Sequence, residues 1–366
     1  MKRQLVPTPF PDELLEGLLG RHSAINGCPN DRRTITALRS EIGMTSGATT
    51  LEIVATGLGI RPADAQRRLT TLPALRPFVD ALRYGQDNAT VRHKSTVSSV
   101  IQRPKADALA CRQCVEQDSA FGNLSYWRRA HHLPGVDWCH VHGNALLRFD
   151  PTAFELPPSE AIRRLGGDTC PAPAEHATAN TLGRYTTLLV SWLDKGEPYD
   201  STAVNRVVQD GCRLHGLRFA QVGQRPVLSD MARQVVPTDW LALYWPKVLA
   251  KQPGAYLGHL DGICKDRHVA YPGATGALAL AMLFDGVDDI LSRLDKAQAA
   301  VASKRETGAA LISAARKAFM DGASLRNVCD VHQIPVLQFE AWLRDVAKQW
   351  SNASAQAEPV SGAGHG

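Results

Sequence analysis

Apolar residues recur at helical spacing along most of the chain, separated by Pro- and Gly-rich stretches that interrupt the pattern. The first amphipathic run covers residues 12–26, where Asp12 follows a Pro-rich turn and is placed to cap a helix. Further helices are predicted over residues 36–42, 181–193, 203–215, 228–235, 239–248, 275–284 and 287–296. The pattern therefore predicts a mainly α-helical fold.

Residues 51–69 have the pattern of a helix-turn-helix. A short apolar helix ends at a Gly-Ile turn, and a second helix begins with Pro62 in its first turn. The second helix carries four side chains that suit contact with nucleic acid or with a protein partner: Arg61, Gln66, Arg67 and Arg68. A plain helical hairpin with a solvated basic face gives the same pattern, so DNA binding is one of two interpretations.

The last folded stretch, residues 307–350, also has a helix-turn-helix pattern. Three helices are predicted there: residues 310–319, 325–332 and 336–349. Ser324 is placed to cap the second of them. The third leaves Arg344 and Lys348 on its outside as candidate contacts. Two carboxylates on the same helix oppose phosphate binding, so protein docking and DNA docking are equally compatible with it.

The clearest chemical motif lies between these two regions. Cys111 and Cys114 form a Cys-x-x-Cys pair, and Cys139 and His142 form a Cys-x-x-His pair about two dozen residues later. Four such ligands complete a tetrahedron and leave no position for water or substrate, so the spacing predicts one structural zinc ion. Chance occurrence and disulfide pairing are the alternatives. Three nearby histidines compete for the imidazole position: His131, His132 and His140.

The stretch between the two ligand pairs is dense in aromatic residues: Phe121, Tyr126, Trp127 and Trp138. A small metal module lacks a large core, so aromatic side chains packed around the metal are the expected substitute. Beside Trp127, the side chains of Arg128 and Arg129 also suit a nucleic-acid or protein surface. Both arginines are therefore candidate contacts.

These patterns divide the chain into successive segments. Residues 1–105 are predicted to form a helical domain of helix-turn-helix type, and residues 106–150 a small zinc-ribbon module. Residues 151–180, rich in Pro and Gly, are predicted to be a linker. Residues 181–350 are predicted to form a second helical domain that ends in the three-helix unit, and residues 351–366 a disordered tail.

Composition changes this picture little. The chain has 366 residues and a formal net charge of +5, which is compatible with nucleic-acid binding but also with proteins that bind none. No stretch reaches the apolar length needed to cross a bilayer, and residues 1–11 lack the features of a secretion signal. We therefore expect a cytoplasmic protein without membrane contact, in which the remaining cysteines are reduced.

Sequence signatures of catalysis are missing. There is no Walker-type phosphate loop, no dinucleotide-binding Gly fingerprint after a strand and no Gly-x-Ser-x-Gly elbow. The acidic residues form no recognisable two-metal set, and the Cys-x-x-Cys pair lacks the His-x-Glu partner of a zinc deaminase. An enzyme is not expected.

Several segments together resemble the TniQ family of transposition target selectors, which includes the longer TnsD proteins. The run from Val6 to Leu15 is similar to the opening of the family. The most specific similarity is the metal block, which combines the Cys/His pairs with Tyr-Trp-Arg-Arg at residues 126–129 and Leu-Pro-Gly-Val at residues 133–136. Weaker similarity to the helical repeats of TnsD-like proteins continues to about residue 291. The chain departs from the family at His140, where many members have Pro, and it continues without a second zinc ribbon.

The resemblance implies a non-catalytic adaptor. Such proteins mark the insertion site, either by binding attachment-site DNA or by associating with a CRISPR effector complex and its guide RNA, and they recruit an AAA+ ATPase regulator. The modest net charge and the mixed-charge last helix favour the guided route. A homodimer is compatible with this role. The competing class is a zinc-containing helix-turn-helix transcriptional regulator, which predicts a dimer and a palindromic operator.

Overall fold

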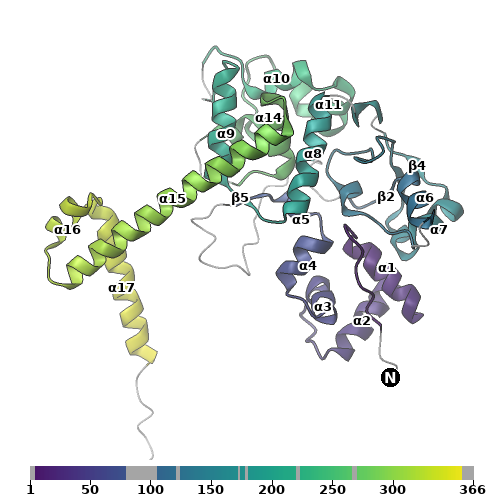
Figure 1. The fold of residues 1–366 in the computed structure, drawn as a ribbon, viewed down its shortest axis with the longest axis horizontal. Coiled ribbons are helices and arrows are strands. Elements are labelled where there is room, and N and C mark those ends of the chain that lie inside the picture. The colour runs from purple at the N-terminus through teal and green to yellow at the C-terminus, as the bar shows by residue number, and fades with distance from the viewer. Residues whose placement is uncertain are drawn as a thin grey trace, which may run out of the picture. The chain divides into compact units, whose positions relative to one another are not determined.

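The computed structural model describes residues 5–79, 105–120, 124–171, 174–177, 180–219, 223–265 and 270–356. Within these ranges the chain is mainly α-helical with short strands, which confirms the predicted fold class (Figure 1). It divides into two compact units, Met1–Gln298 and Ala299–Gly366. None of the described helices combines the length and the apolar character needed to span a membrane.

The first unit begins with short helices: α1 (Leu15–Asn26), α2 (Asp31–Glu41), α3 (Thr50–Gly57), α4 (Pro62–Leu69) and α5 (Leu72–Leu75). Leu18, Val54 and Leu69 bring α1, α3 and α4 together in one buried apolar cluster. The start of α3 is fixed locally, because Thr49 and Glu52 exchange hydrogen bonds in a capping box. The predicted pair of short helices over residues 51–69 is therefore present as α3 and α4.

The start of α1 differs from the prediction. The helix begins at Leu15 with Leu14 in the N-cap position, and Asp12 does not cap it. Asp12 adopts a left-handed backbone conformation with φ of 59°. Its carboxylate accepts hydrogen bonds from Arg129 Nε and from the Ala130 amide. The Asp12 side chain thus binds residues distant in sequence instead of capping the helix, as local spacing predicted.

The metal module is a small antiparallel sheet surrounded by short helices (Figure 1). Its elements are β2 (Ala108–Ala110), α6 (Arg112–Ala120), the 3-10 helix η2 (Arg129–His132), β3 (Leu147–Phe149), the 3-10 helix η3 (Pro151–Glu155), α7 (Pro158–Leu165) and β4 (Asp168–Thr169). The strand order is β2-β3-β4. Ala108 pairs with Phe149, and Leu147 pairs with both Ala110 and Thr169.

The segment predicted to be a linker, residues 151–180, packs onto this module where it is described. Phe154 and Ala161 are buried in one apolar cluster with Trp127, and β4 extends the sheet. Pro151 and Pro158 lie in the first turns of η3 and α7, Pro157 directly precedes α7, and Gly166 ends α7 with φ of 77°. The metal module therefore reaches beyond residue 150.

Helix α1 lies against the module with close backbone contact. A Cβ atom added at Gly20 would be 1.8 Å from the Phe154 carbonyl oxygen, and one added at Gly17 would be 2.8 Å from a Trp127 ring atom. Only glycine permits such an approach. The Leu14 amide also donates to the Trp127 carbonyl at 2.8 Å. Helix α1 and the module are consequently packed as one body.

The rest of the first unit is helical around one core. It comprises β1 (Phe78–Val79), the 3-10 helix η4 (Ala174–Ala177), α8 (Asn180–Lys195), β5 (Tyr199–Asp200), α9 (Ser201–Leu214), α10 (Leu228–Val235), α11 (Thr238–Tyr244), α12 (Pro246–Ala250), α13 (Gly258–Asp261), the 3-10 helix η5 (Gly262–Cys264) and α14 (Gly273–Leu283). Every residue of α14 is buried, and the helix packs against α8 and α9. Phe78 and, from the metal module, Trp138 belong to the same core cluster. One core cluster therefore includes residues from both sides of the predicted boundaries near residues 105, 150 and 180.

Most predicted helices are present, with two departures. The helix predicted over residues 239–248 is divided into α11 and α12, because Pro246 cannot continue the backbone hydrogen bonding of α11. The helices predicted over residues 287–296 and 310–319 are one continuous helix, α15 (Val287–Met320). The intervening residues are largely strong helix formers, and the single Gly308 does not end the helix.

The second unit has an apolar core of its own. Its described part contains the end of α15 together with α16 (Leu325–His332) and α17 (Val336–Gln356). Val328 and Phe339 are buried in one cluster, and Ser324 caps α16 as predicted. Helix α17 continues beyond residue 350, where the sequence predicts disorder. The rest of that tail, residues 357–366, lies outside the described ranges, as does Phe121.

Gly20→Ala should destabilise the first unit. The added methyl group collides with the Phe154 carbonyl oxygen, and relief requires movement of α1 or η3. We expect the free energy of unfolding to fall by about 1–3 kcal/mol in urea denaturation of the full chain. Gly308→Ala is the control, because nothing lies within 4 Å of the added carbon, and its helix propensity should make it neutral or slightly stabilising. Equal stability of the two variants would contradict the close approach of α1 to η3.

Candidate metal centre

Two short turns hold the candidate metal ligands. Cys111 directly follows β2, and Cys114 lies in the first turn of α6. Cys139 and His142 lie in a tight turn that is closed by a hydrogen bond of 2.7 Å from the Gly143 amide to the Cys139 carbonyl. Gly143 has φ of 70°, a conformation that favours glycine. Each ligand pair is thus brought together by its own local backbone turn.

The four ligand atoms form a cluster of tetrahedral size. All of them lie within 4.8 Å of one another. His142 Nδ1 is 3.4–3.5 Å from each of the three sulfur atoms, and the sulfur atoms of Cys114 and Cys139 are 3.6 Å apart. Metal–sulfur bonds of about 2.3 Å and metal–nitrogen bonds of about 2.0–2.1 Å give tetrahedral edges of about 3.5–3.8 Å. The four distances given above match these edges, so the cluster has about the size that one tetrahedral ion needs.

The charges of the three thiols also favour a bound cation. Hydrogen bonds from Cys114 and Cys139 lower the pKa of Cys111, whereas hydrogen bonding to Cys111 raises the pKa of Cys114 and of Cys139. Without a cation, neighbouring sulfurs share protons, because like charges at this distance repel. A divalent ion stabilises all three as thiolates. Among the described residues, no other group of three or more Cys, His, Asp or Glu side chains lies close enough together to hold a metal ion.

The three competing histidines have other positions. His131 is buried, and its Nε2 lies 3.8 Å from Cys114 Sγ. From there it can orient this candidate ligand without binding the metal itself. His132 is also buried: its Nδ1 lies 2.8 Å from the Arg128 carbonyl oxygen, and its Nε2 lies 3.1 Å from a backbone amide of β2. Burial lowers the pKa of His131 to about 3 and that of His132 to about 4, so both are neutral near pH 7. His140 is exposed.

A further thiol lies beside the centre, and the sequence spacing gives no sign of it. Cys170 directly follows β4 and is buried in the same small cluster as the three cysteine ligands. Its sulfur does not belong to the group of four ligand atoms. Burial raises the pKa of Cys170 to about 11, so it remains a thiol. Cys170 is near the centre only because β4 pairs with β3, which no local pattern predicts.

Arg129, a predicted surface contact, is a buried cross-link. Its side chain is 7% exposed. Nε donates to Asp12 at 3.1 Å, while one terminal nitrogen donates to the carbonyl oxygens of Arg67 at 2.6 Å and Thr70 at 3.4 Å. These two carbonyls lie at the C-terminal end of α4, which carries a partial negative charge. Arg129 therefore joins the metal module to both the N-terminal segment and α4.

Arg128 is also engaged within the chain. Its guanidinium donates to Asp118 at 2.7 Å and lies 4.2 Å from the centroid of the Tyr126 ring. A second hydrogen bond joins it to the Tyr126 hydroxyl. Asp118 belongs to α6, the helix that carries Cys114. The contact therefore braces one of the two ligand turns.

The candidates on α4 are partly paired. Arg61 forms an ion pair of 2.7 Å with Asp64, and Arg67 lies 3.9 Å from Asp64 and 3.8 Å from Glu197. Such exposed pairs contribute little to stability, but they compete with phosphate for the same cations. The remaining candidates on α4 are exposed: Gln66 and Arg68.

The candidates of the second unit lie on the outside of α17. Arg344 and Lys348 are both exposed. By helical spacing they lie on the side opposite the buried Phe339. Arg344 Nε is 3.4 Å from the backbone carbonyl of Glu340.

A buried ion pair anchors the module on α11. Lys105 Nζ lies 2.6 Å from Asp137 Oδ1, and the Tyr244 hydroxyl donates to the other carboxylate oxygen. Burial and the neighbouring carboxylate raise the pKa of Tyr244, so it stays protonated and can donate. None of these residues belongs to a recognisable motif, so the sequence alone does not reveal the anchor.

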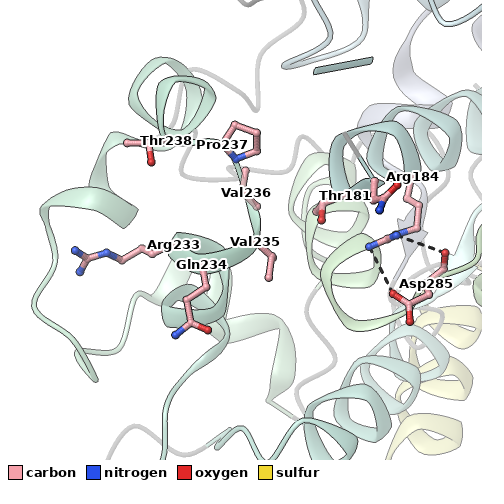
Figure 2. A pocket seen from close by; sticks show the side chains of 10 residues that line it. Thr181, Arg184, Arg233, Gln234, Val235, Val236, Pro237, Thr238 and Asp285 are labelled. Carbon is pink, nitrogen blue, oxygen red and sulfur yellow. Dashed lines mark hydrogen bonds and ion pairs between the residues drawn. The ribbon is translucent and has the colours of Figure 1, made fainter. Parts of the chain in front are cut away.

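A separate hollow of about 500 Å³ lies between α8 and the segment from α10 to α11. Figure 2 shows the side chains that line it. Arg184 lines it, but its Nε donates to the Ala281 carbonyl at 2.9 Å, and Asp285 lies 3.9 Å from another of its nitrogens. Arg233 extends away from Arg184 (Figure 2). The lining offers polar contacts without a paired nucleophile and base.

Comparison with known proteins bears on the first part of the chain. A family model described as TniQ matches residues 4–146, which include the N-terminal helices and all four metal ligands. No curated protein matches the chain. The family match confirms the resemblance seen in the metal block and associates the protein with transposition.

Cys139→Ser should remove the metal. A serine hydroxyl is a poor replacement for a thiolate, and the module has little apolar core to keep the turns together without the ion. We expect about one metal ion per chain in the native protein and much less in the variant, measured by mass spectrometry of the purified proteins. Cys170→Ser is the matched control, because it alters a buried thiol of the same cluster outside the ligand set. Equal metal content in both variants would contradict the assigned ligands.

Acid should weaken the module through His132. Burial lowers the pKa of His132 from 6.5 to about 4, so the unfolded chain takes up the proton first. The contribution of neutral His132 to the free energy of unfolding is complete above about pH 6.5. It is lost as the pH falls towards 4, by up to about 1.4 kcal/mol per pH unit. The glutamine of His132→Gln cannot titrate. The variant should therefore be less stable than the native chain at neutral pH, but its free energy of unfolding should fall less between about pH 6.5 and 5. Parallel pH profiles in urea denaturation would contradict this assignment.

Proposed function

Because the chain belongs to the TniQ family through its residues 4–146, we propose that it is a non-catalytic adaptor that selects the target site for DNA transposition. The family match carries this proposal. The metal cluster supports the absence of catalysis, because four protein ligands fill a tetrahedron and leave no position for an activated water. In this role the protein, in the cytoplasm, links a target-recognition element to an AAA+ ATPase regulator.

The metal in this proposal is one structural zinc ion. Three thiolates and one imidazole at tetrahedral spacing form the donor set of closed zinc sites. The ion would hold the turn at Cys111 and Cys114 against the turn at Cys139 and His142. The module would then act as a rigid joint between α1 and the larger helical core, both of which pack on it.

For target recognition, we propose a CRISPR effector complex with its guide RNA in preference to attachment-site DNA. Direct binding to DNA depends on cations that are free to replace counterions at the phosphates. Arg129 is buried and Arg128 is paired with Asp118, and two of the α4 arginines face carboxylates. The exposed candidates that remain are Gln66, Arg68, Arg344 and Lys348. This small set supports a protein that depends on another component to read the sequence.

The second candidate function is that of a zinc-containing helix-turn-helix transcriptional regulator. The α3–α4 and α16–α17 pairs favour it, because each joins two helices through a short turn. A regulator of this kind needs a homodimer that presents paired helices to half-sites about one helical turn apart. An adaptor can also form a homodimer, so the bound partners and not the oligomeric state distinguish the two functions.

Affinity purification of the tagged chain from cells that express its genomic neighbours tests the proposal. We expect to recover the AAA+ ATPase together with CRISPR effector subunits and a guide RNA. Recovery of the ATPase with one enriched DNA duplex would replace the guided route by direct site reading. A duplex without any transposition protein would support the regulator instead. Cys139→Ser should lose these partners, whereas Cys170→Ser should retain them.

A further inference from the structure

We propose that η2 couples metal binding to the placement of α4, with Arg129 as the positioning residue. All four residues of η2 are buried. Its last two residues contact the elements that carry the metal ligands, and its first two contact Asp12 or α4. This inference depends on the metal assignment above and is independent of the adaptor role.

The C-terminal half of η2 faces the ligand turns. His131 Nε2 lies 3.8 Å from Cys114 Sγ. The next residue, His132, accepts the Leu109 amide of β2 at 3.1 Å, and β2 leads directly into Cys111. Both contacts depend on strand β2 and helix α6 staying where the metal ion holds their ligands. Loss of the ion would therefore release the support on this side of η2.

The N-terminal half of η2 faces Asp12 and α4. The Arg129 amide donates to the Asp12 carbonyl at 2.8 Å, and the Ala130 amide donates to the Asp12 carboxylate at 3.2 Å. The Arg129 guanidinium reaches the carbonyls of Arg67 and Thr70. These carbonyls have no acceptor role inside α4, because the last turn of a helix lacks the next amides. One buried cation thus holds both the N-terminal segment and the end of α4.

Helix α4 reaches the larger core mainly through the chain itself, because α5 follows it after two residues and packs against α8. Its own side chains make few contacts there. Ala65 and Leu69 are buried against α1 and α3, within the N-terminal helices. The ion pair between Arg67 and Glu197 is 3.8 Å long, and both of its side chains are substantially exposed. A 3-10 helix of four residues has little rigidity of its own, so contacts at its two ends fix its position. Movement of η2 would therefore move or loosen α4, together with its exposed Arg68.

Hydrogen–deuterium exchange on the full, metal-loaded chain tests this coupling. In Arg129→Met the metal should remain bound, while amides of α4 and of the segment around Asp12 should exchange at least about tenfold faster than in the native protein. Arg128→Met is the matched control. It removes an adjacent arginine whose bonds go to Asp118 and Tyr126 and not to α4. In metal-loaded Arg128→Met, with the metal content confirmed, α4 exchange should stay native. Unchanged α4 protection in Arg129→Met would overturn the proposal.

Metal removal provides the second measurement. Chelation should speed exchange in α4 of the native chain, but it should add little in Arg129→Met, because the connection is already broken. Fully additive effects of chelation and substitution would overturn the proposal. If Arg129→Met fails to fold, Arg129→Lys replaces it: a lysine keeps the charge facing Asp12 but loses the planar fork that reaches several acceptors. That variant should retain the metal and still loosen α4, and native α4 protection in it would also count against the coupling. Loss of transposition partners affects neither measurement.

Discussion

A sheet of three short strands cannot hold its shape unaided, and the helices around it in the metal module are short as well. Strands β2 and β3 are 3 residues long and β4 has 2. The apolar clusters beneath them are small, and one consists largely of the cysteines themselves. A structural metal contributes on the order of 10 kcal/mol to folding, which is comparable with the whole stability of a typical domain. An ion bound by the candidate ligand cluster would therefore be the interaction that gives the module a defined structure.

Helices on both sides of the module depend on that structure. The Tyr185 hydroxyl of α8 donates to the Pro134 carbonyl at 2.7 Å, and Trp240 Nε1 of α11 donates to the Gly135 carbonyl at 2.8 Å. Both acceptors belong to the short segment between η2 and the second ligand turn. Loss of such a buried hydrogen bond leaves an unsatisfied group at a cost of about 1–3 kcal/mol, so each bond specifies one position of the helix on the module. The backbone contact of α1 with η3 imposes a similar restriction on the other side.

The sequence predicts well those features that depend on residues close together in the chain. The grouping of the four candidate ligands follows from spacing, because each pair occupies one backbone turn. Most helices follow from the period of their apolar residues. The role of Asp12 and the burial of Arg129 could not be predicted, because each depends on a partner distant in sequence. The same is true of residues 151–165: their prolines are as typical of a linker as of helix starts, and only Phe154 reaching the module core distinguishes the two.

The arginines show that net charge alone does not tell which cations are available to a partner. A surplus of positive charge favours nucleic acid only if the cations face solvent. Arg129 does not: burial lowers its pKa and raises that of Asp12, which shows that removal from water opposes the charge on both partners. Such a pair adds little net stability, because desolvation offsets the attraction, but it fixes the relative position of the segments it joins. Arg129 therefore contributes to the position of these segments and not to the exposed positive charge, which other arginines such as Arg32, Arg33 and Arg68 supply.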